Sequence, residues 1–316
     1  MNKNILLRAL KKIIEIRIVE NMIAKVFKKN KIYSFLHLSI GQEACATGVA
    51  FGTKFNDQFF GNHRSHAHYL SKNGNLEKMI MEVFGDRRGC CGGYGGSMHL
   101  LDKKVNFMGS IPILGSAVSI ASGMAMANKL SNKKNVTTVF VGDGAAEEGG
   151  FYETINMAGL YKLPLLVVIE DNRYAVESDF KKRKVRNYSH ENIFKKGMNC
   201  EYIRTNGQDF KKVYNSTRIL RSKIIKNNKV GLLHLDCLRF SKHSGSTVTL
   251  EDQKSKYRRN EEFSEILKND PIEILKQQIH RLGLSKKNII HFEKMCVRNV
   301  DTKFNRILKK IKIRTL

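Results

Sequence analysis

Residues 140–150 read FVGDGAAEEGG, where an apolar run at 136–141 leads through a glycine-flanked turn into a helix-like segment. A strand, a tight turn and a helix N-terminus together suit a phosphate, because free N–H groups and the helix dipole point at the anion. The turn nevertheless carries Asp143 and no lysine, with Glu147 and Glu148 close behind. The stretch therefore indicates an α/β fold, and it raises the question of why a carboxylate stands where an anion should bind.

The segments around this turn alternate between strand-like and helix-like patterns. Strands are expected at 136–142, 164–170, 200–205 and 230–240. Helices are expected before, between and after them, at about 115–130, 147–160 and 209–225. This alternation predicts an α/β fold with a doubly wound parallel sheet.

The chain of 316 residues is long enough for one large α/β domain or two small ones. We expect a single domain over 1–316, because the sequence contains no long low-complexity linker and no repeat. A helical segment at about 1–30 and a charged helical tail at about 255–316, with a helix near 271–282, should flank the sheet. The stretch GCCGGYGGSMH at 89–99 is expected to be the most flexible, since glycine fills five of the eight positions from 89 to 96.

The chain is strongly basic, with 56 Lys and Arg against 29 Asp and Glu and a formal net charge of +27. The positive residues are spread along the sequence and are not interleaved with aromatic residues in a repeat, so no nucleic-acid partner is expected. No apolar run approaches the roughly 20 residues needed to cross a bilayer, so no membrane association is expected. Cys90 and Cys91 are adjacent and no C-x-x-C occurs, a spacing that suits neither zinc nor disulfides and favours a reducing, cytoplasmic location.

A divalent cation would explain the carboxylate in the turn. Mg²⁺ prefers about six oxygen ligands and is commonly held by one or two protein carboxylates together with phosphate oxygens. Asp143 stands at the carboxyl end of an expected strand, which is where an open α/β sheet places its ligand. Asn172 follows the next expected strand and offers an amide oxygen. The two side chains are therefore predicted to share a Mg²⁺ ion.

The spacing of these two residues adds a family resemblance. GDG, then 26 residues, then DN resembles the signature of thiamine-diphosphate enzymes. In that family the Asp, the Asn and a backbone carbonyl two residues later hold the metal, which implies Asp143, Asn172 and the carbonyl of Tyr174 here. Residues 142–176 resemble, more narrowly, the alpha subunit of the decarboxylating component of 2-oxo acid dehydrogenase complexes, pyruvate and acetoin types included. Matches such as FLHLSIGQEA, NHRSHAHYL, GGYGGSMHL and RFSKHS extend the resemblance over roughly 5–282.

The resemblance implies roles for further residues. Cofactor contacts are implied for His63, Arg64, Pro112, Leu114, Asp143, Gly144, Ala145, Asn172, Tyr174, Arg239 and His243. Catalytic roles are implied for His37, His66 and His243. We expect His37 and His243 to stabilise oxyanions or to move protons, for which an ordinary histidine pKa of about 6.5 is suited.

Several positions depart from the family pattern. His63 stands where the family has Tyr, and Asp171 where it usually has Asn. Pro112 replaces a Gly, which stiffens the backbone and removes an N–H group. Lys242 replaces the Gly before His243.

The resemblance also implies an activity and its partners. The chain should be a thiamine-diphosphate- and Mg²⁺-dependent oxidoreductase that acts on the oxo group of a 2-oxo acid or of acetoin and passes the acyl group to lipoamide. Two alpha and two beta chains should form the enzyme and work with a lipoyl-bearing acyltransferase. His37 and His66 fit the pyruvate and acetoin types better than the mammalian branched-chain type. The branched-chain type and a related thiamine-diphosphate enzyme of a specialised pathway stay alternatives. A non-catalytic assembly subunit is the alternative of another class.

Overall fold

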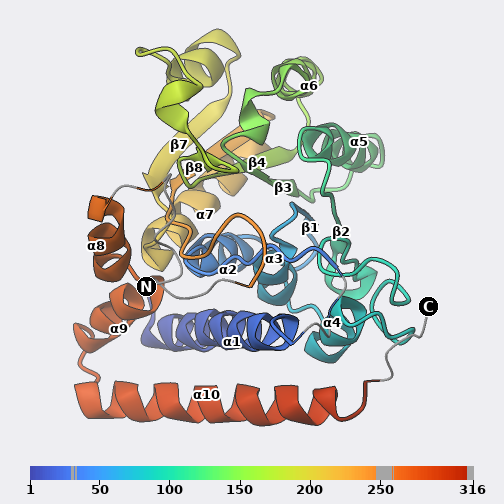
Figure 1. Cartoon of the computed structure of the whole chain (residues 1–316). Coiled ribbons are helices and arrows are strands. Elements are labelled where there is room, and N and C mark those ends of the chain that lie inside the picture. Colours follow the sequence, from blue (N-terminus) through green and yellow to red (C-terminus); the bar gives the residue numbers. More distant parts are fainter. Residues whose placement is uncertain (30–31, 33, 247–257, 259, 312–316) are drawn as a thin grey trace.

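A six-stranded parallel sheet forms the centre of the computed structural model, which describes residues 1–29, 32, 34–246, 258 and 260–311 (Figure 1). Its strand order is β2-β1-β3-β4-β8-β7, and every neighbouring pair is parallel. The strands are β1 (Gln58–Gly61), β2 (Phe107–Ser110), β3 (Thr137–Gly142), β4 (Leu165–Asp171), β7 (Glu201–Asn206) and β8 (Gly231–Asp236). The predicted α/β fold with a parallel, doubly wound sheet is therefore confirmed.

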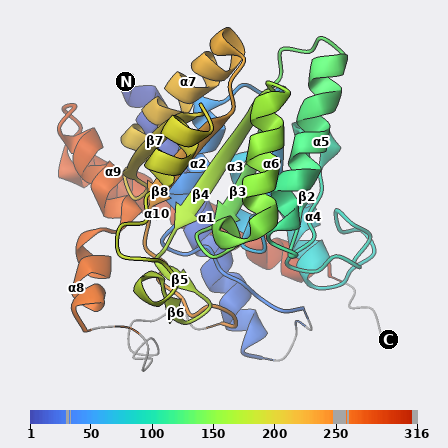
Figure 2. The same ribbon diagram turned by 90° about the horizontal axis from the view of Figure 1, so that it is seen from above.

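The central strands are apolar runs because helices cover both faces of the sheet. All seven residues of β4, LLVVIED, are buried, and so is every residue of β3 except its last. The two strands pair in register from Thr137 with Leu165 to Gly142 with Glu170, so they end side by side. A small antiparallel hairpin, β5 (Tyr174–Ala175) and β6 (Ser178–Asp179), lies beyond this edge (Figure 2).

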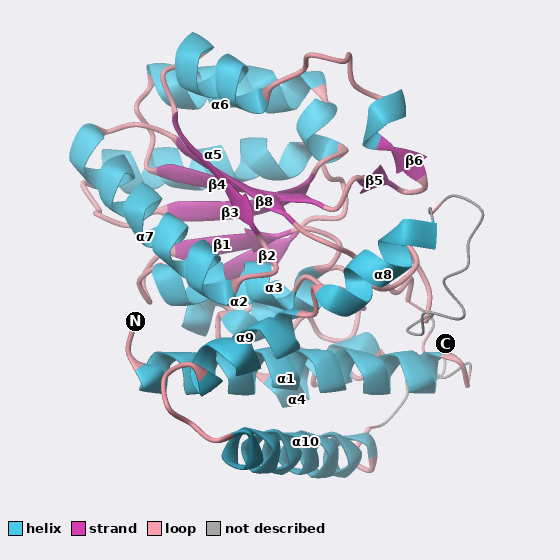
Figure 3. Ribbon diagram, turned by 90° about the vertical axis from the view of Figure 1, so that its left-hand side faces the viewer, coloured by secondary structure: helices cyan, strands magenta, loops and turns pink. Residues whose placement is uncertain are grey.

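Helices form layers on the two faces of the sheet (Figure 3). One face carries α5 (Ser116–Leu130) and α6 (Gly149–Leu160), whose alanines and Phe151 pack against Val139, Val167 and neighbouring strand residues. The other face carries α2 (Glu43–Gly52), α3 (Ser65–Ser71) and α7 (Phe210–Asn227). The two faces of the sheet are thus covered, and a ligand of the sheet itself would bind at the strand ends.

A further helical layer covers α2 and α3 from outside. The expected N-terminal helix is α1 (Lys3–Phe27), and α9 (Pro271–His280) and α10 (Lys286–Leu308) pack on it. The remaining helices are α4 (Leu76–Val83) and α8 (Asn260–Lys268), with 3-10 turns at Lys103–Val105, Ala145–Glu147 and Phe180–Lys182 and a π-helical turn at Asn192–Gly197. The expected tail at 255–316 contains α8, α9 and α10, joined by short turns; 255–257, 259 and 312–316 lie outside the described residues.

Two local expectations were wrong. The strand expected at 230–240 ends at Asp236, because the chain then leaves the sheet and the Phe240 N–H donates to the carbonyl of Ile40. The stretch at 89–99, expected to be flexible, wraps around the buried carboxylate of Glu82, which accepts three of its backbone N–H groups. Among the described residues, no helix is long and apolar enough to cross a membrane.

Candidate active site

The predicted cofactor-binding residues all follow the carboxyl ends of strands. His63 and Arg64 follow β1, Pro112 and Leu114 follow β2, Asp143 to Ala145 follow β3, Asn172 and Tyr174 follow β4, and Arg239 and His243 follow β8. The chain runs from β1 outward to β2 and then returns to β3 on the other side of β1. Such a reversal opens a crevice at the carboxyl edge, where open α/β sheets bind their ligands.

The two predicted metal ligands lie on neighbouring loops of this edge. Asp143 comes directly after β3 and Asn172 directly after β4, and both side chains are buried. The amide oxygen of Asn172 accepts the N–H of Tyr174 at 3.3 Å, in a turn that holds Arg173 at a φ of 70°. A carboxylate, an amide oxygen and a peptide carbonyl from one edge are the hard oxygen donors that Mg²⁺ takes.

The carboxylate of Asp143 is paired with an arginine that the sequence analysis did not identify. Arg183 places one nitrogen 2.5 Å from Asp143 Oδ2 and another 2.5 Å from Glu147 Oε2, and Lys184 lies 3.3 Å from Glu147. Burial raises the pKa of Asp143, and the nearby charge of Asp171 adds to this, while Arg183 opposes both. A cation beside this carboxylate is therefore required, and Mg²⁺ could take that place.

A second set of side chains holds the turn that carries Asn172. The carboxylate of Asp171 accepts a hydrogen bond from the backbone N–H of Arg173 and pairs with His234 Nε2 at 2.9 Å. His234 Nδ1 in turn lies 2.8 Å from the hydroxyl of Tyr202. Burial raises the pKa of Asp171. The hydrogen bond with His234 and the nearby positive charges lower this pKa by more, so the net shift is downward. Asp171, the departure from the family pattern, thus stays ionised.

Three of the predicted histidines and both arginines converge at the same edge. The ring centroids of His37, His63 and His243 lie 4.8 to 5.5 Å apart. The Arg64 guanidinium donates to the carbonyl of His243 at 2.9 Å, and nitrogens of Arg64 and Arg239 lie 3.2 and 3.4 Å from His243 Nδ1. Since guanidinium can only donate, Nδ1 of His243 is an acceptor and its proton sits on Nε2.

These histidines do not have the ordinary pKa that was expected. Burial, followed by the charge of Arg64, lowers the pKa of His37 to about 4 and that of His243 to about 3. The same causes lower the pKa of His63 further. At neutral pH the three rings are therefore neutral hydrogen-bonding groups beside two fixed positive charges.

This cluster contains buried polar atoms without a hydrogen-bond partner among the described residues. Both ring nitrogens of His63 and Nδ1 of His37 are buried and have no hydrogen-bond partner within the described ranges. Buried polar atoms in a folded protein are nearly always satisfied, by water or a ligand where protein groups are absent. Together with Arg64 and Arg239, they suit an anionic ligand with several oxygen atoms.

His66 is placed differently from the other predicted catalytic histidines. Its ring is fully buried, with Nε2 2.9 Å from the hydroxyl of Ser97 and Nδ1 3.3 Å from the carboxylate of Glu20. The structure therefore gives His66 a position in the core behind the cluster of His37, His63 and His243. Its catalytic role stays a prediction.

The remaining predicted residues shape the walls of the site. Gly144 approaches the hairpin closely, because a Cβ built there would lie 2.7 Å from Cβ of Ala175. Pro112 is partly buried, and Leu114 packs against the core beneath α5 and α6, as does Ala145. Lys242 is exposed and does not have the positive φ that would require glycine, so this departure leaves the backbone unstrained.

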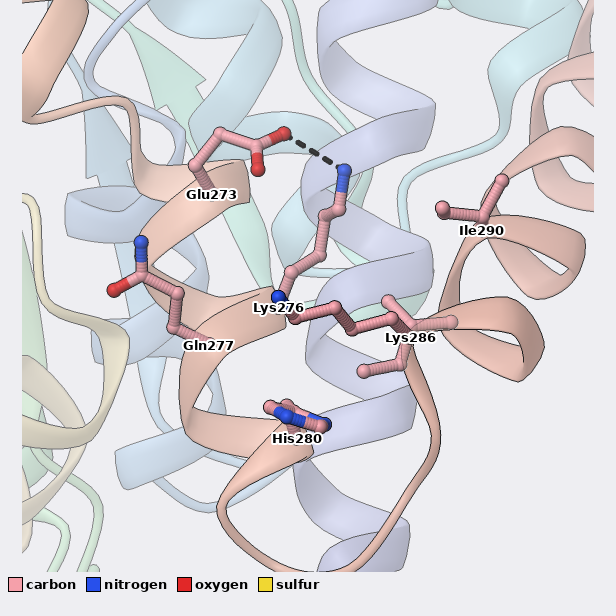
Figure 4. A pocket seen from close by; sticks show the side chains of 7 residues that line it. Glu273, Lys276, Gln277, His280, Lys286 and Ile290 are labelled. Carbon is pink, nitrogen blue, oxygen red and sulfur yellow. Dashed lines mark hydrogen bonds and ion pairs between the residues drawn. The ribbon is translucent and has the colours of Figure 1, made fainter.

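A separate cavity of 310 Å³ lies between α9 and α10 (Figure 4). Lys276 crosses it and pairs with Glu273 and Glu293, each at 2.7 Å. The cavity is distant in the fold from the strand ends and contributes no residue to the cluster described above.

Comparisons with known proteins place the chain as a whole in one family. The family model described as "Dehydrogenase E1 component" matches residues 11–310. The chain is 31% identical over 268 residues to the pyruvate dehydrogenase E1 component subunit alpha of Rickettsia prowazekii, which covers 84% of this chain and 79% of that protein. It is 32% identical over 282 residues to the chloroplastic pyruvate dehydrogenase E1 component subunit alpha-3 of Arabidopsis thaliana. The aligned residues cover 86% of this chain and 63% of that protein. With the mitochondrial subunit alpha of Schizosaccharomyces pombe it shares 30% identity over 289 residues, or 91% and 68% of the two chains.

Proposed function

The chain belongs to the dehydrogenase E1 component family, and on this premise we propose that it is the alpha subunit of a thiamine-diphosphate-dependent 2-oxo acid dehydrogenase of the pyruvate or acetoin type. One observation carries the proposal. The loops after β1, β3, β4 and β8, with the segment before α2 that carries His37, bring two arginines, three histidines, a carboxylate and an amide to one edge of the sheet.

The residues at this edge fit Mg²⁺ and a diphosphate. Asp143, Asn172 and the carbonyl of Tyr174 would hold the metal, whose charge would take over the role that Arg183 has beside Asp143. Arg64 and Arg239 would hold the phosphate oxygens, and the unpaired nitrogens of His63 supply a further hydrogen bond. The close approach of Gly144 to Ala175 leaves the backbone, rather than a side chain, to line the site.

When bound, thiamine diphosphate supplies the carbon nucleophile and the electron sink that cleavage of a 2-oxo acid requires. The residues of this chain would position the cofactor and the substrate and would neutralise their negative charges. Neutral His37 and the Nε2–H of His243 would donate hydrogen bonds to the carboxylate or the developing oxyanion of the substrate, with the two arginines adding a positive field. A neutral donor does not lose a proton to a bound carboxylate, so the site keeps its charge during turnover.

The surface beside this edge suits a partner subunit. Ile113 is 74% exposed just before α5, and Ile120 is 50% exposed on α5 itself. The small residues that precede and form α5, among them Gly115, Ser119 and Gly123, would let another helix approach closely. We therefore propose a beta subunit as the partner, in an assembly of two alpha and two beta chains that passes its acyl group to a lipoyl-bearing acyltransferase.

Replacement of His243 tests the proposal. His243→Ala in the assembled enzyme should keep most of its affinity for thiamine diphosphate and lose at least about 100-fold in the release of carbon dioxide from a 2-oxo acid, the usual scale for a proton or oxyanion contact. His291→Ala, an exposed histidine on α10, is the matched control and should be fully active. Ordinary turnover by His243→Ala would refute the assignment, and cofactor binding without turnover in the unaltered assembly would favour the non-catalytic subunit.

A further inference from the structure

A second cluster of metal-ligating side chains lies away from the strand ends, where α4 meets the stretch that follows it. Glu82 is in the last turn of α4, and Cys90 and Cys91 are partly exposed in the turn beyond it. One ligand atom from each of the three residues lies within 4.8 Å of the others. The adjacent cysteines alone have poor spacing for zinc, but the fold adds a carboxylate that the sequence pattern did not reveal.

The carboxylate is fixed in place by the backbone around it. Glu82 Oε2 accepts the N–H groups of Cys91 and Gly93 at 2.7 and 2.9 Å, and Oε1 accepts that of Gly95 at 2.6 Å. Gly89 packs so closely that a Cβ there would lie 2.3 Å from Oε2. A carboxylate has about four lone-pair positions, so these three amides leave one for another partner.

The two thiols complete a set of three donors. The Sγ atoms of Cys90 and Cys91 lie within 4.8 Å of each other and of a carboxylate oxygen of Glu82, so both sulfurs face the carboxylate. In a tetrahedral zinc site with Zn–S of about 2.3 Å and Zn–O of about 2.0–2.2 Å, ligand atoms lie about 3.6–3.8 Å apart. The observed spacing is within about 1 Å of this, which rotation of two partly exposed thiols can close.

We propose that Glu82, Cys90 and Cys91 form a binding site for one thiophilic divalent cation of the Zn²⁺ type, with water as the fourth ligand. On binding, two S–H bonds break and two S–metal bonds form, and the two protons pass to solvent, so no oxidant is needed. Two sulfur ligands exclude Mg²⁺, which prefers oxygen, and separate this site chemically from Asp143 and Asn172. The ion would link α4 to the turn that leads to Ser97, the hydrogen-bond partner of His66.

Cadmium titration of the full chain, kept reduced, tests the site directly. Cd²⁺ bound to thiolate gives an ultraviolet charge-transfer absorption that binding to histidine or carboxylate does not. The unaltered chain should reach this absorption at one equivalent and show a rise in melting temperature, since a ligand of the native state stabilises it. Zn²⁺ should displace the Cd²⁺ and abolish the signal.

Cys91→Ser should lose the absorption and bind Cd²⁺ at least about 100-fold more weakly. Loss of a group that only supports a metal ligand already costs up to about 100-fold in affinity, and loss of the ligand itself should cost no less. Cys90→Ser should behave alike, whereas Cys200→Ser, a buried thiol elsewhere, should match the unaltered chain. A signal that persists in Cys91→Ser, or its absence from the unaltered chain while mass spectrometry shows six free thiols, would overturn the proposal. Conversion of the pair to a disulfide in place of metal binding would overturn it as well.

Discussion

Asp143 shows how a single residue in the opening stretch decides the chemistry of the site. Its carboxylate is buried, and burial raises its pKa, so an adjacent cation is needed to keep it charged. In the structure Arg183 provides that cation, and the same guanidinium also contacts Glu147. Arg183 could not be identified from sequence, because forty positions separate it from Asp143 and it belongs to a basic run that looks like ordinary surface.

Removal of the Asp143 carboxylate should separate metal binding from folding. In Asp143→Ala we expect Mg²⁺-dependent affinity for thiamine diphosphate to fall at least about 100-fold in the assembled protein, since the metal loses its only carboxylate here. The fold should survive, because Arg183 keeps Glu147 as its partner. Calorimetry measures the affinity and circular dichroism the fold, with Asp301→Ala on the exposed face of α10 as the control. An unchanged affinity would show that the metal is held elsewhere.

The histidines at the site should make stability depend on pH. In the folded chain the pKa of His37 is about 4 and that of His243 about 3, below the unfolded value of about 6.5. Between these values the unfolded chain binds more protons, so protonation favours unfolding. The free energy of unfolding contributed by these groups is therefore retained above pH 6.5 and lost as the pH falls towards about 4.

Urea denaturation of the chain without cofactor, at several pH values between about 7 and 5, measures this effect. His37→Asn removes one titrating ring and should flatten the decrease in unfolding free energy, whereas His291→Asn, an exposed ring on α10, should not. Equal pH dependence in the unaltered chain and in His37→Asn would show that His37 has an ordinary pKa in the folded state.

At the scale of elements, the sequence predicted those whose pattern is local. The central strands are largely apolar segments bounded by turns, and α1, α5, α6 and α7 were expected within a few residues of their observed ends. β1 and β2 were missed because each has only four residues, too few for a periodic pattern. The fixed conformation of the turn at 89–95 was not predicted, because it depends on hydrogen bonds to the carboxylate of Glu82. The glycine-rich sequence does not indicate that Glu82 is the partner of this turn.

α10 was predicted only as part of a charged helical tail, without bounds of its own, and for a different physical reason. Only Ile289, Cys296, Phe304 and Ile307 are buried in its 23 residues, and the remainder mixes six Lys and Arg with acidic, polar and partly exposed apolar residues. The sequence therefore looks like a charged tail, and the helix gains its stability from packing on α1 rather than from a continuous apolar face.

Truncation of Phe304 tests whether α10 is part of the folded unit. Its side chain is fully buried in the cluster that contains Ile16, Val19 and Ile23 of α1. Phe304→Ala should lower the free energy of unfolding by about 3–5 kcal/mol, the usual cost of a cavity left by a buried phenylalanine. Lys303→Ala, exposed on the same helix, should stay within about 0.5 kcal/mol of the unaltered chain. A loss below 1 kcal/mol for Phe304→Ala would mean that α10 is only loosely attached.

At the scale of the whole molecule, we propose that the chain supplies one part of a site that a partner completes. The residues that would hold a metal and a diphosphate lie together at the carboxyl edge of the sheet. Asp143 and Asn172 were predicted from their positions after expected strands, and the other residues were implied by the family resemblance. Among the described residues at this edge, none is assigned as the acid that would activate the organic part of the cofactor, and the family resemblance implies that a beta subunit supplies it. The exposed Ile113 and Ile120 beside the edge fit a surface that a partner covers.

The last prediction concerns this missing half. The purified chain alone should bind thiamine diphosphate weakly and release no measurable carbon dioxide from a 2-oxo acid, because loss of a positioned acid or base alone costs about 100- to 10,000-fold. Co-expression with a beta subunit should restore turnover, with a native mass that corresponds to two chains of each kind. Ile120→Asp, which places a charge in the proposed interface, should weaken assembly, whereas Ile290→Asp, equally accessible on α10, should not. Full turnover by a single-chain species would show that this chain completes its own site and that no beta subunit is required.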